Sequence, residues 1–178
     1  MRLGYAPRRM QWDPLGELSP FEDIPEWMVS QPVAVPCLPG ATIPFVLENL
    51  AEDPAPHEIA AAVRRFLDLT ATDRDQASPH IFRNYVEFAE AVEDVDVVID
   101  RPEDVWAHVH PTAIHVSRRH RRDRKVYVQI TANCDWEQEH GLQIVYRDGN
   151  QLSRVSSQDG HLTHTDAYDL PEDKDRIS

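Results

Sequence analysis

A two-residue alternation of apolar and polar side chains between positions 112 and 155 limits the folds open to this chain more than any other feature of its sequence. This period places one set of side chains on a buried face and the other toward solvent. It predicts three half-buried strands, at residues 114–117, 126–131 and 142–147. Gly149 favours a hairpin turn after the third run, so residues 151–155 are expected to return as a fourth strand of an antiparallel β-meander.

The period lengthens in the middle of the chain to that of an amphipathic helix. Ile59, Val63 and Phe66 recur at helical spacing and predict a helix with one apolar face. Asp53 is a residue type that caps helix N-termini, and Pro54 fits the first turn, where a missing N–H costs nothing. We therefore expect this helix to begin near Asp53.

A second helix is predicted to start at Ser78, because the apolar residues that follow it again share one helical face. Its opposite face is acidic and is expected to be solvated. The acidic residues of that face are Glu87, Glu90, Glu93 and Asp94. A third, shorter helical turn is predicted at residues 102–109, where Asp100 and Glu103 have the spacing of a capping box.

The first third of the chain is rich in proline. Residues 1–30 predict an irregular arm packed on the core, because proline fixes φ and removes a hydrogen-bond donor. Two β-like runs, at residues 33–38 and 42–48, are joined by a Pro-Gly turn and predict a hairpin at a sheet edge. Residues 170–178 predict a frayed polar tail. The sequence thus predicts one α+β domain over residues 31–169, with an N-terminal arm and hairpin, two to three middle helices and a C-terminal antiparallel β-meander.

The chain carries a formal net charge of -13, and its acidic excess is greatest between residues 51 and 100. A surface of this sign repels nucleic acids and anionic lipids, and it speeds the encounter with a basic partner. We interpret the acidic helices either as a source of solubility alone or as the surface that meets a basic protein.

No stretch of about 18 apolar residues is present, and the basic N-terminus is not followed by an apolar segment. We therefore expect a cytoplasmic protein without a membrane span or a signal peptide. The two cysteines, Cys37 and Cys134, lack a close metal-ligand spacing. Two interpretations remain for them: free thiols in a reducing compartment, or a single disulfide.

Polar residues that are able to bind a metal ion gather in two segments that flank strand ends. His140, Asp159 and His161 form the candidate ligand set, with His164 close by, and imidazole and carboxylate groups suit zinc or another divalent metal. An open coordination position would activate water, as in a metal-dependent hydrolase. No helical pair of histidines and no pair of cysteines fixes such a geometry.

The same two segments also have a purely structural interpretation. Asp135 and Glu139 are able to accept backbone N–H groups, and Gly141 is able to adopt a left-handed conformation. Trp136 is then expected to cover the open end of the core. In this interpretation the two histidines at positions 140 and 161 satisfy buried polar groups and bind no ion.

Six of the basic residues fall between Arg118 and Lys125. Taken alone, this run suits phosphate contacts. It coincides with a predicted hairpin loop, however, and it has no interleaved aromatic residues on which bases would stack. We expect a solvated loop, or a loop paired with acidic helices, and no nucleic-acid binding.

Motifs of common enzyme classes are absent from the sequence. No G-x-S-x-G, P-loop or G-x-G-x-x-G pattern is found. Cys134 and His140 are close enough in sequence to suggest a thiolate pair, but burial at a strand end is the commoner fate of a free cysteine. We therefore expect no catalytic residues.

The segment VYVQITANCDWEQEHGLQIVYRDGNQLSRVSSQDGHLT, residues 126–163, resembles the C-terminal signature of a bacterial family of uncharacterised domains. In that signature a strand leads into C-x-W-x-x-E-H-G-L and later into D-G-H-x-T. The resemblance implies a bacterial, cytoplasmic protein and transfers no activity. The positions that carry it are Cys134, Trp136, Glu139, His140, Gly141, Asp148, Gly149, Asp159, Gly160 and His161.

Two functions follow as hypotheses from these observations. The first is a non-enzymatic interaction protein, such as an immunity-type inhibitor whose acidic surface binds a basic partner without any cofactor. The second is a metal-binding module or metal-dependent hydrolase that uses His140, Asp159 and His161. A structural domain within a larger complex is a third alternative.

Overall fold

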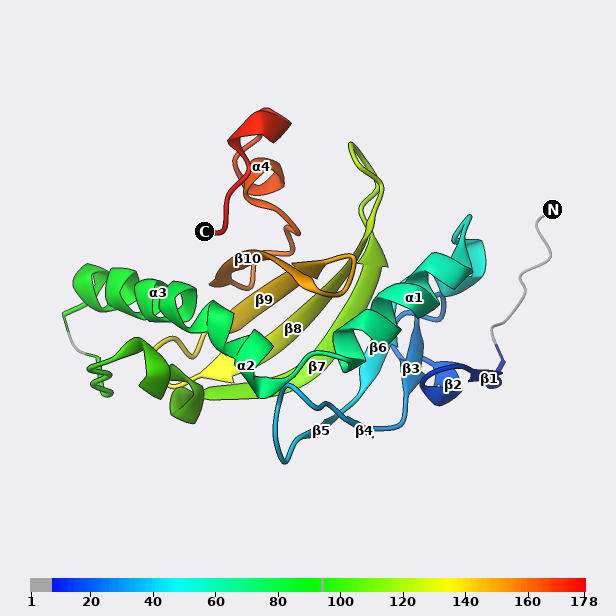
Figure 1. The fold of residues 1–178 in the computed structure, drawn as a ribbon, viewed down its shortest axis with the longest axis horizontal. Helices are drawn as coiled ribbons and strands as arrows, with labels where there is room; N and C mark the ends of the chain where they lie inside the picture. The colour runs from blue at the N-terminus through cyan, green and yellow to red at the C-terminus, as the bar shows by residue number, and fades with distance from the viewer. Residues whose placement is uncertain (1–7, 94) are drawn as a thin grey trace.

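The computed structural model of this chain describes residues 8–93 and 95–178 and has an α+β fold built around one sheet of eight strands (Figure 1). In order across the sheet, the strands are β1 (Met10–Trp12), β2 (Gly16–Pro20), β3 (Met28–Ser30), β6 (Phe45–Leu47), β7 (Val109–Arg118), β8 (Val126–Cys134), β9 (Leu142–Arg147) and β10 (Gln151–Ser157). The last four strands pair antiparallel in sequence order. The predicted α+β class and C-terminal meander are therefore confirmed.

Helical segments occupy the middle of the chain and its C-terminal end. The α-helices are α1 (Pro56–Leu67), α2 (Ala71–Arg74), α3 (Ser78–Ala91) and α4 (His164–Ala167), and the 3-10 helices are η1 (Leu50–Glu52), η2 (Asp75–Ala77), η3 (Pro102–His108) and η4 (Glu172–Lys174). The three predicted middle helices correspond to α1, α3 and η3. Within the described ranges, no helix has the length and apolar character required to cross a membrane.

One predicted helix start and one predicted capping box are wrong. The helix α1 begins at Pro56, because Asp53 uses its Oδ1 atom to accept the N–H of Ala55 at 2.8 Å and so forms a turn before the helix. The 3-10 helix η3 has no side-chain cap, so Asp100 and Glu103 do not form the predicted capping box.

The strands β6 and β7 pair in parallel, with Val46 opposite His115. Parallel neighbours need a long crossover connection, and the segment that contains α1, α2, α3 and η3 supplies it. In Figure 1 these helices lie along one side of the sheet. The ring of Phe66 in α1 lies 6.1 Å from that of Phe45 in β6 and 5.7 Å from that of Tyr146 in β9, so one helix residue joins the two halves of the sheet.

Residues 10–30 are more regular than the predicted irregular arm, because β1, β2 and β3 extend the main sheet. Their prolines occupy positions that need no ladder donor: Pro14 lies in the turn between β1 and β2, and Pro20 ends β2. Leu18 and Met28 are buried and attach this region to the core. The first seven residues of the predicted arm lie outside the described residues.

The predicted hairpin is confirmed only in part. The strands β4 (Val33–Ala34) and β5 (Thr42–Ile43) pair antiparallel as a separate two-stranded sheet. After Pro44 the chain leaves this hairpin, and β6 joins the main sheet between β3 and β7. The backbone oxygen of Pro44 accepts the N–H of Ile114 at 3.0 Å, which begins the parallel pairing.

The C-terminal residues 170–178 are polar and mostly exposed, as predicted, but hydrogen bonds at their end attach them to the domain, so they do not form the predicted frayed tail. The carbonyl oxygen of Ser178 accepts the N–H of Val155 in the edge strand β10 at 3.2 Å. Arg83 of α3 donates to the carbonyl oxygen of Ile177 at 3.1 Å. The polar composition of this segment predicted fraying. Composition alone does not reveal that the charged residues of the segment pair with residues elsewhere in the chain.

Gly149, in the turn between β9 and β10, touches the helix layer. It has a φ of +86°, and a Cβ atom added to it would lie 2.0 Å from the carbonyl oxygen of Ala62 in α1. The glycine therefore serves both the turn and the close approach of sheet and helix. Sequence reasoning identified the first of these roles and missed the second.

The substitution Gly149→Ala is expected to lower the free energy of unfolding by more than about 3 kcal/mol, because a backbone clash adds to the cost of a left-handed conformation. Gly40→Ala is the matched control, since Gly40 has a φ of +80° and open space around its Cβ position. It should lose only about 1 kcal/mol. Urea denaturation measures both losses, and equal losses would contradict the close approach.

Candidate functional site

The end of β8 is closed by two of the signature residues. Cys134 is buried and its Sγ atom donates to the carbonyl oxygen of Glu137 at 3.3 Å. Trp136 is also buried; its Nε1 donates to Oδ1 of Asn84 in α3 at 3.1 Å, and its ring lies 5.9 Å from that of Tyr85. The structure thus places Trp136 as a cover over the end of the core, as the structural interpretation predicted.

The thiol of Cys134 is not poised as a nucleophile. Burial raises its pKa to about 11, so the group is protonated near neutral pH. Cys37 is likewise buried, with a pKa raised by burial to about 11. Both cysteines are free, so the disulfide considered from the sequence is not formed.

The turn after Trp136 is stabilised by Glu137 and not by the predicted acceptors Asp135 and Glu139. The carboxylate of Glu137 is buried and accepts the backbone N–H groups of Glu139 at 2.8 Å and His140 at 3.0 Å. The side chain of His140 is 65% exposed, so it does not satisfy buried groups as predicted. The sequence offered no means of deciding which of three neighbouring acids would turn inward.

Gly141 ends this turn in the expected left-handed conformation, with a φ of +69°. A Cβ atom at this position would lie 2.5 Å from the carbonyl oxygen of Ala132 in β8. The conformation and the close contact together explain why a glycine stands between β8 and β9.

Removal of the Glu137 carboxylate is expected to destabilise the fold strongly. In Glu137→Ala two backbone N–H groups lose their acceptor, which costs about 1–3 kcal/mol for each buried group. The neighbouring Glu139→Ala removes an exposed carboxylate and should change stability by less than about 0.5 kcal/mol. Chemical denaturation of the two variants distinguishes them; a larger loss in Glu139→Ala would show that the wrong acid has been assigned to the turn.

A second corner, after β10, is organised by an ion pair. Arg154 is buried, and its guanidinium donates to both oxygens of Asp159 at 2.6 and 2.7 Å. Burial alone would raise the pKa of Asp159, but the hydrogen bonds from Arg154 lower it below its usual value. Asp159 also accepts the N–H of His161 at 3.0 Å and the Nε2 of Gln143 at 3.1 Å. This carboxylate is therefore already occupied.

The candidate metal ligands are not gathered into one site. In the part of the chain that the structure describes, no group of three or more His, Cys, Asp or Glu side chains has the arrangement needed to hold a metal ion. Asp159 is taken by Arg154, and the exposed His140 lies 3.2 Å from the Glu137 carboxylate at the other corner. His164 is buried, with its Nδ1 2.7 Å from Oγ of Ser178.

A histidine pair that sequence reasoning missed lies at the start of β7. One oxygen of Asp135 is 2.9 Å from Nδ1 of His108, and the other is 2.7 Å from Nε2 of His110. The hydrogen bonds from His110 and then His108 lower the pKa of Asp135. The signal available in the sequence was the His-x-His spacing, which places both rings on one side of an extended segment. The cluster is exposed to solvent and joins the ends of β7 and β8.

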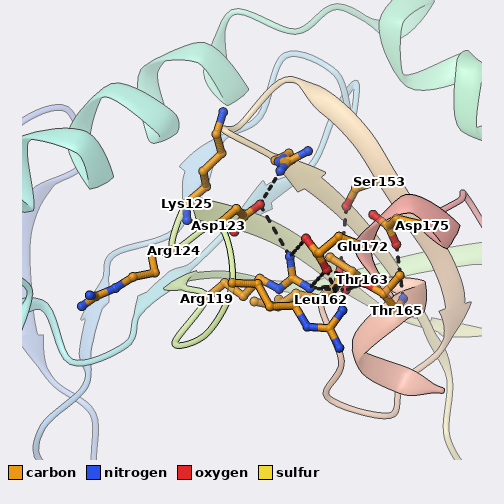
Figure 2. A network of polar contacts seen from close by, with 12 residues as sticks. Arg119, Asp123, Arg124, Lys125, Ser153, Leu162, Thr163, Thr165, Glu172 and Asp175 are labelled. Atoms are coloured by element: carbon orange, nitrogen blue, oxygen red, sulfur yellow. Dashed lines mark hydrogen bonds and ion pairs between the residues drawn. The ribbon is translucent and has the colours of Figure 1, made fainter. Parts of the chain in front are cut away.

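The basic run from Arg118 to Lys125 is largely neutralised within the chain (Figure 2). Arg118 pairs with Asp53 at 2.9 Å and Glu58 at 2.7 Å. The other pairs within 3.0 Å are Arg119 with Asp166 and Glu172, Arg122 with Glu172, and Lys125 with Asp148. The expectation of a loop paired with acidic segments therefore describes this run better than a solvated loop does.

Arg119 is the centre of this network. Its side chain is only 4% exposed, and its guanidinium donates to Asp166 at 2.7 Å and to Glu172 at 2.9 Å. The hydroxyl groups of Thr163 and Thr165 complete its hydrogen bonds at 3.1 and 3.3 Å. Figure 2 shows Thr163, Thr165 and Glu172 of the C-terminal segment beside Arg119. The network therefore fastens residues 163–174 to the β7–β8 hairpin.

The Arg119 network makes stability depend on acid pH. The hydrogen bond from Arg119 lowers the pKa of Glu172 to about 2, from an ordinary value of 4.5. A depressed carboxyl pKa stabilises the fold above pH 4.5, and this contribution is lost as the pH falls toward 2. We expect the free energy of unfolding to fall less steeply over this interval in Glu172→Gln than in the wild type.

Urea denaturation at pH 6, 4 and 3 measures that slope. Asp173→Asn is the matched control, because the neighbouring Asp173 side chain is 74% exposed and pairs only weakly with Lys174 at 3.7 Å. It should retain the wild-type slope. An unchanged slope in Glu172→Gln would show that the pair with Arg119 does not contribute to acid sensitivity.

An acidic surface lies on α3 and the loop that follows it. We define the acidic face by four exposed carboxylates: Glu87, Glu90, Glu93 and Asp96. The opposite side of α3 buries Ile81 and Tyr85 in the core, which fixes the orientation of the helix. In Figure 1 the C-terminal end of α3 projects away from the sheet. Glu87, Glu90 and Glu93 are thus available to solvent, as the sequence predicted, whereas the fourth residue of that prediction, Asp94, lies outside the described residues.

Comparison with known proteins agrees with the resemblance to a family of uncharacterised domains. A family model described as Domain of unknown function (DUF6985) matches residues 14–162. No curated protein and no solved structure matches this chain. The matched interval contains the sheet from β2 to β10 and both corners described above. Because the match covers most of its length, the chain belongs to the family Domain of unknown function (DUF6985).

Proposed function

We propose that this protein is a non-enzymatic interaction protein that binds a basic protein partner through the acidic face of α3. The observation that carries the proposal is the exposure of Glu90, Glu93 and Asp96, which have no ion-pair partner among the described residues. Glu87 makes only a long contact of 3.8 Å with Arg83. These carboxylates are free to meet cations from outside.

The distribution of the other charges supports this proposal. The densest basic segment is neutralised by internal pairs at Arg118, Arg119 and Lys125. The long-range field of the molecule is therefore set by its net charge of -13, which attracts a basic protein and repels nucleic acid. Electrostatic attraction of this kind raises the association rate more than it raises affinity.

Two exposed apolar side chains lie next to the acidic face in the sequence. Val98, in the loop between α3 and η3, is 76% exposed, and Val92 at the end of α3 is 37% exposed. Interfaces gain affinity from apolar groups surrounded by a polar rim. We propose that these valines contact the partner after the carboxylates have steered it.

An immunity-type inhibitor is the form of this function that we favour. In this proposal the protein is bacterial and cytoplasmic, and its partner is a basic toxin such as a nuclease. The size and acidity of the domain support such a role by analogy, and the internal pairing of the basic run argues against direct binding to the nucleic acid that a nuclease would cut.

The test begins with capture from extracts of cells that encode the protein, at low salt, followed by purification of the retained partner. The triple variant Glu87→Gln, Glu90→Gln, Glu93→Gln should slow association about tenfold and flatten its dependence on salt. The matched control is Glu22→Gln, Asp23→Asn, Glu26→Gln, which removes the same charge from the exposed loop between β2 and β3.

Association rates measured by surface plasmon resonance distinguish the two variants. A control that keeps most of the wild-type rate supports the acidic face as the binding surface. Equal slowing in both variants would show that only net charge matters, and recovery of no basic partner would contradict the proposal.

A further inference from the structure

An open cavity, lined by both polar and apolar groups, lies on the face of the sheet that is turned away from α1. Its volume is about 680 Å³, and its floor is formed by His115 and Ser117 of β7 and by Gln129 and Thr131 of β8. The floor is polar because the intervening residues, such as Ile114 and Ile130, point into the core. A volume of this size is typical of sites for small molecules.

One wall of the cavity is aromatic. The indole of Trp27 lies 6.0 Å from the His115 ring, at an interplanar angle of 82°. Nδ1 of His115 lies 3.2 Å from Oε1 of Glu48, so the carboxylate fixes the orientation of the imidazole. This wall is held rigidly, since Glu48 follows β6 and its backbone N–H donates to the carbonyl oxygen of Val116 at 3.0 Å.

Basic side chains line part of the rim of the cavity. His120 and Arg121 line it from the β7–β8 loop, and His161 lines it from the loop after β10. Within residues 8–93 and 95–178, no carboxylate forms an ion pair with Arg121, whereas Arg118 and Arg119, which also line the cavity, are paired. This basic rim contrasts with the acidic net charge of the protein.

The carboxylates that line the cavity do not cancel this charge. Glu48 is engaged by His115 and Asp166 is engaged by Arg119. The unpaired ionisable groups that face the cavity are therefore cationic or neutral. A phosphate suits such a rim, because its terminal oxygens accept hydrogen bonds from donors on more than one loop.

We propose that this cavity is a binding site for a small organic phosphate that carries a planar ring, the chemistry of a nucleoside monophosphate. The phosphate binds Arg121 together with the rim imidazoles, and the ring lies against Trp27. The amide oxygen of Gln129 accepts a hydrogen bond from the polar edge of the ring, while its Nε2 stays bonded to Oε1 of Gln143 at 2.9 Å. This site does not rest on the proposed function, because it uses none of the residues of the acidic face.

Calorimetric titration of the full chain with AMP tests the proposal. Binding should occur with a Kd below about 1 mM, and Arg121→Gln should weaken it about tenfold, because a charge-assisted hydrogen bond is lost. Arg124→Gln is the matched control: it removes the same charge from the same loop, at a residue that does not line the cavity. It should bind AMP as the wild type does.

Two further measurements separate the parts of the ligand. Adenosine, which lacks the phosphate, should bind at least about tenfold more weakly than AMP. In a ¹H–¹⁵N spectrum, the indole signal of Trp27, assigned with Trp27→Phe, should shift on addition of AMP. Absence of AMP binding, equal weakening by Arg121→Gln and Arg124→Gln, or an unmoved Trp27 signal would overturn the proposal.

Discussion

The parallel pairing of β6 with β7 is the constraint on which the rest of this fold depends. It is anchored by the backbone bonds from Ile114 to Pro44 and from Glu48 to Val116, each 3.0 Å long. Strands that run in the same direction cannot be joined by a hairpin, so the chain between them must cross over the sheet. That crossover brings the helices to one face of the sheet and leaves the other face for the cavity.

Local patterns predicted much of the fold. The alternation that identified the meander and the stripe that identified α1 are properties of neighbouring residues, so they can be read from the sequence. The parallel pair, by contrast, joins residues near 46 and 115, and the contact of Gly149 with Ala62 joins a turn to a distant helix. The local periodicity of a sequence carries no information about such distant partners. The lack of such long-range information also explains why the short strands among the prolines of residues 10–30 were predicted as an irregular arm.

For the polar residues, too, local features were predicted from the sequence and long-range partners were not. Sequence reasoning identified both corners and the role of Trp136, but it kept Asp159 as an alternative metal ligand because it did not anticipate Arg154 as the partner. It also assigned the turn contacts to Asp135 and Glu139, although Glu137 makes them. In each case one of several similar side chains is selected by burial, and burial is decided by packing between distant segments. The signature residues described here mainly hold the fold together, while the proposed binding surfaces lie beside them.

The burial of Arg119 makes the domain sensitive to changes at its C-terminal end. Its two closest counter-charges belong to the final stretch of the chain, so detaching that stretch would break both pairs and leave Arg119 with only the longer contact to Asp123 at 3.6 Å among its ion pairs in the described residues. A protease that cleaves near Asp169, or a fusion that pulls on the last residues, would therefore loosen the β7–β8 hairpin as well as the end of the chain. The last fifteen residues are therefore an integral part of the domain and help to hold the β7–β8 hairpin in place.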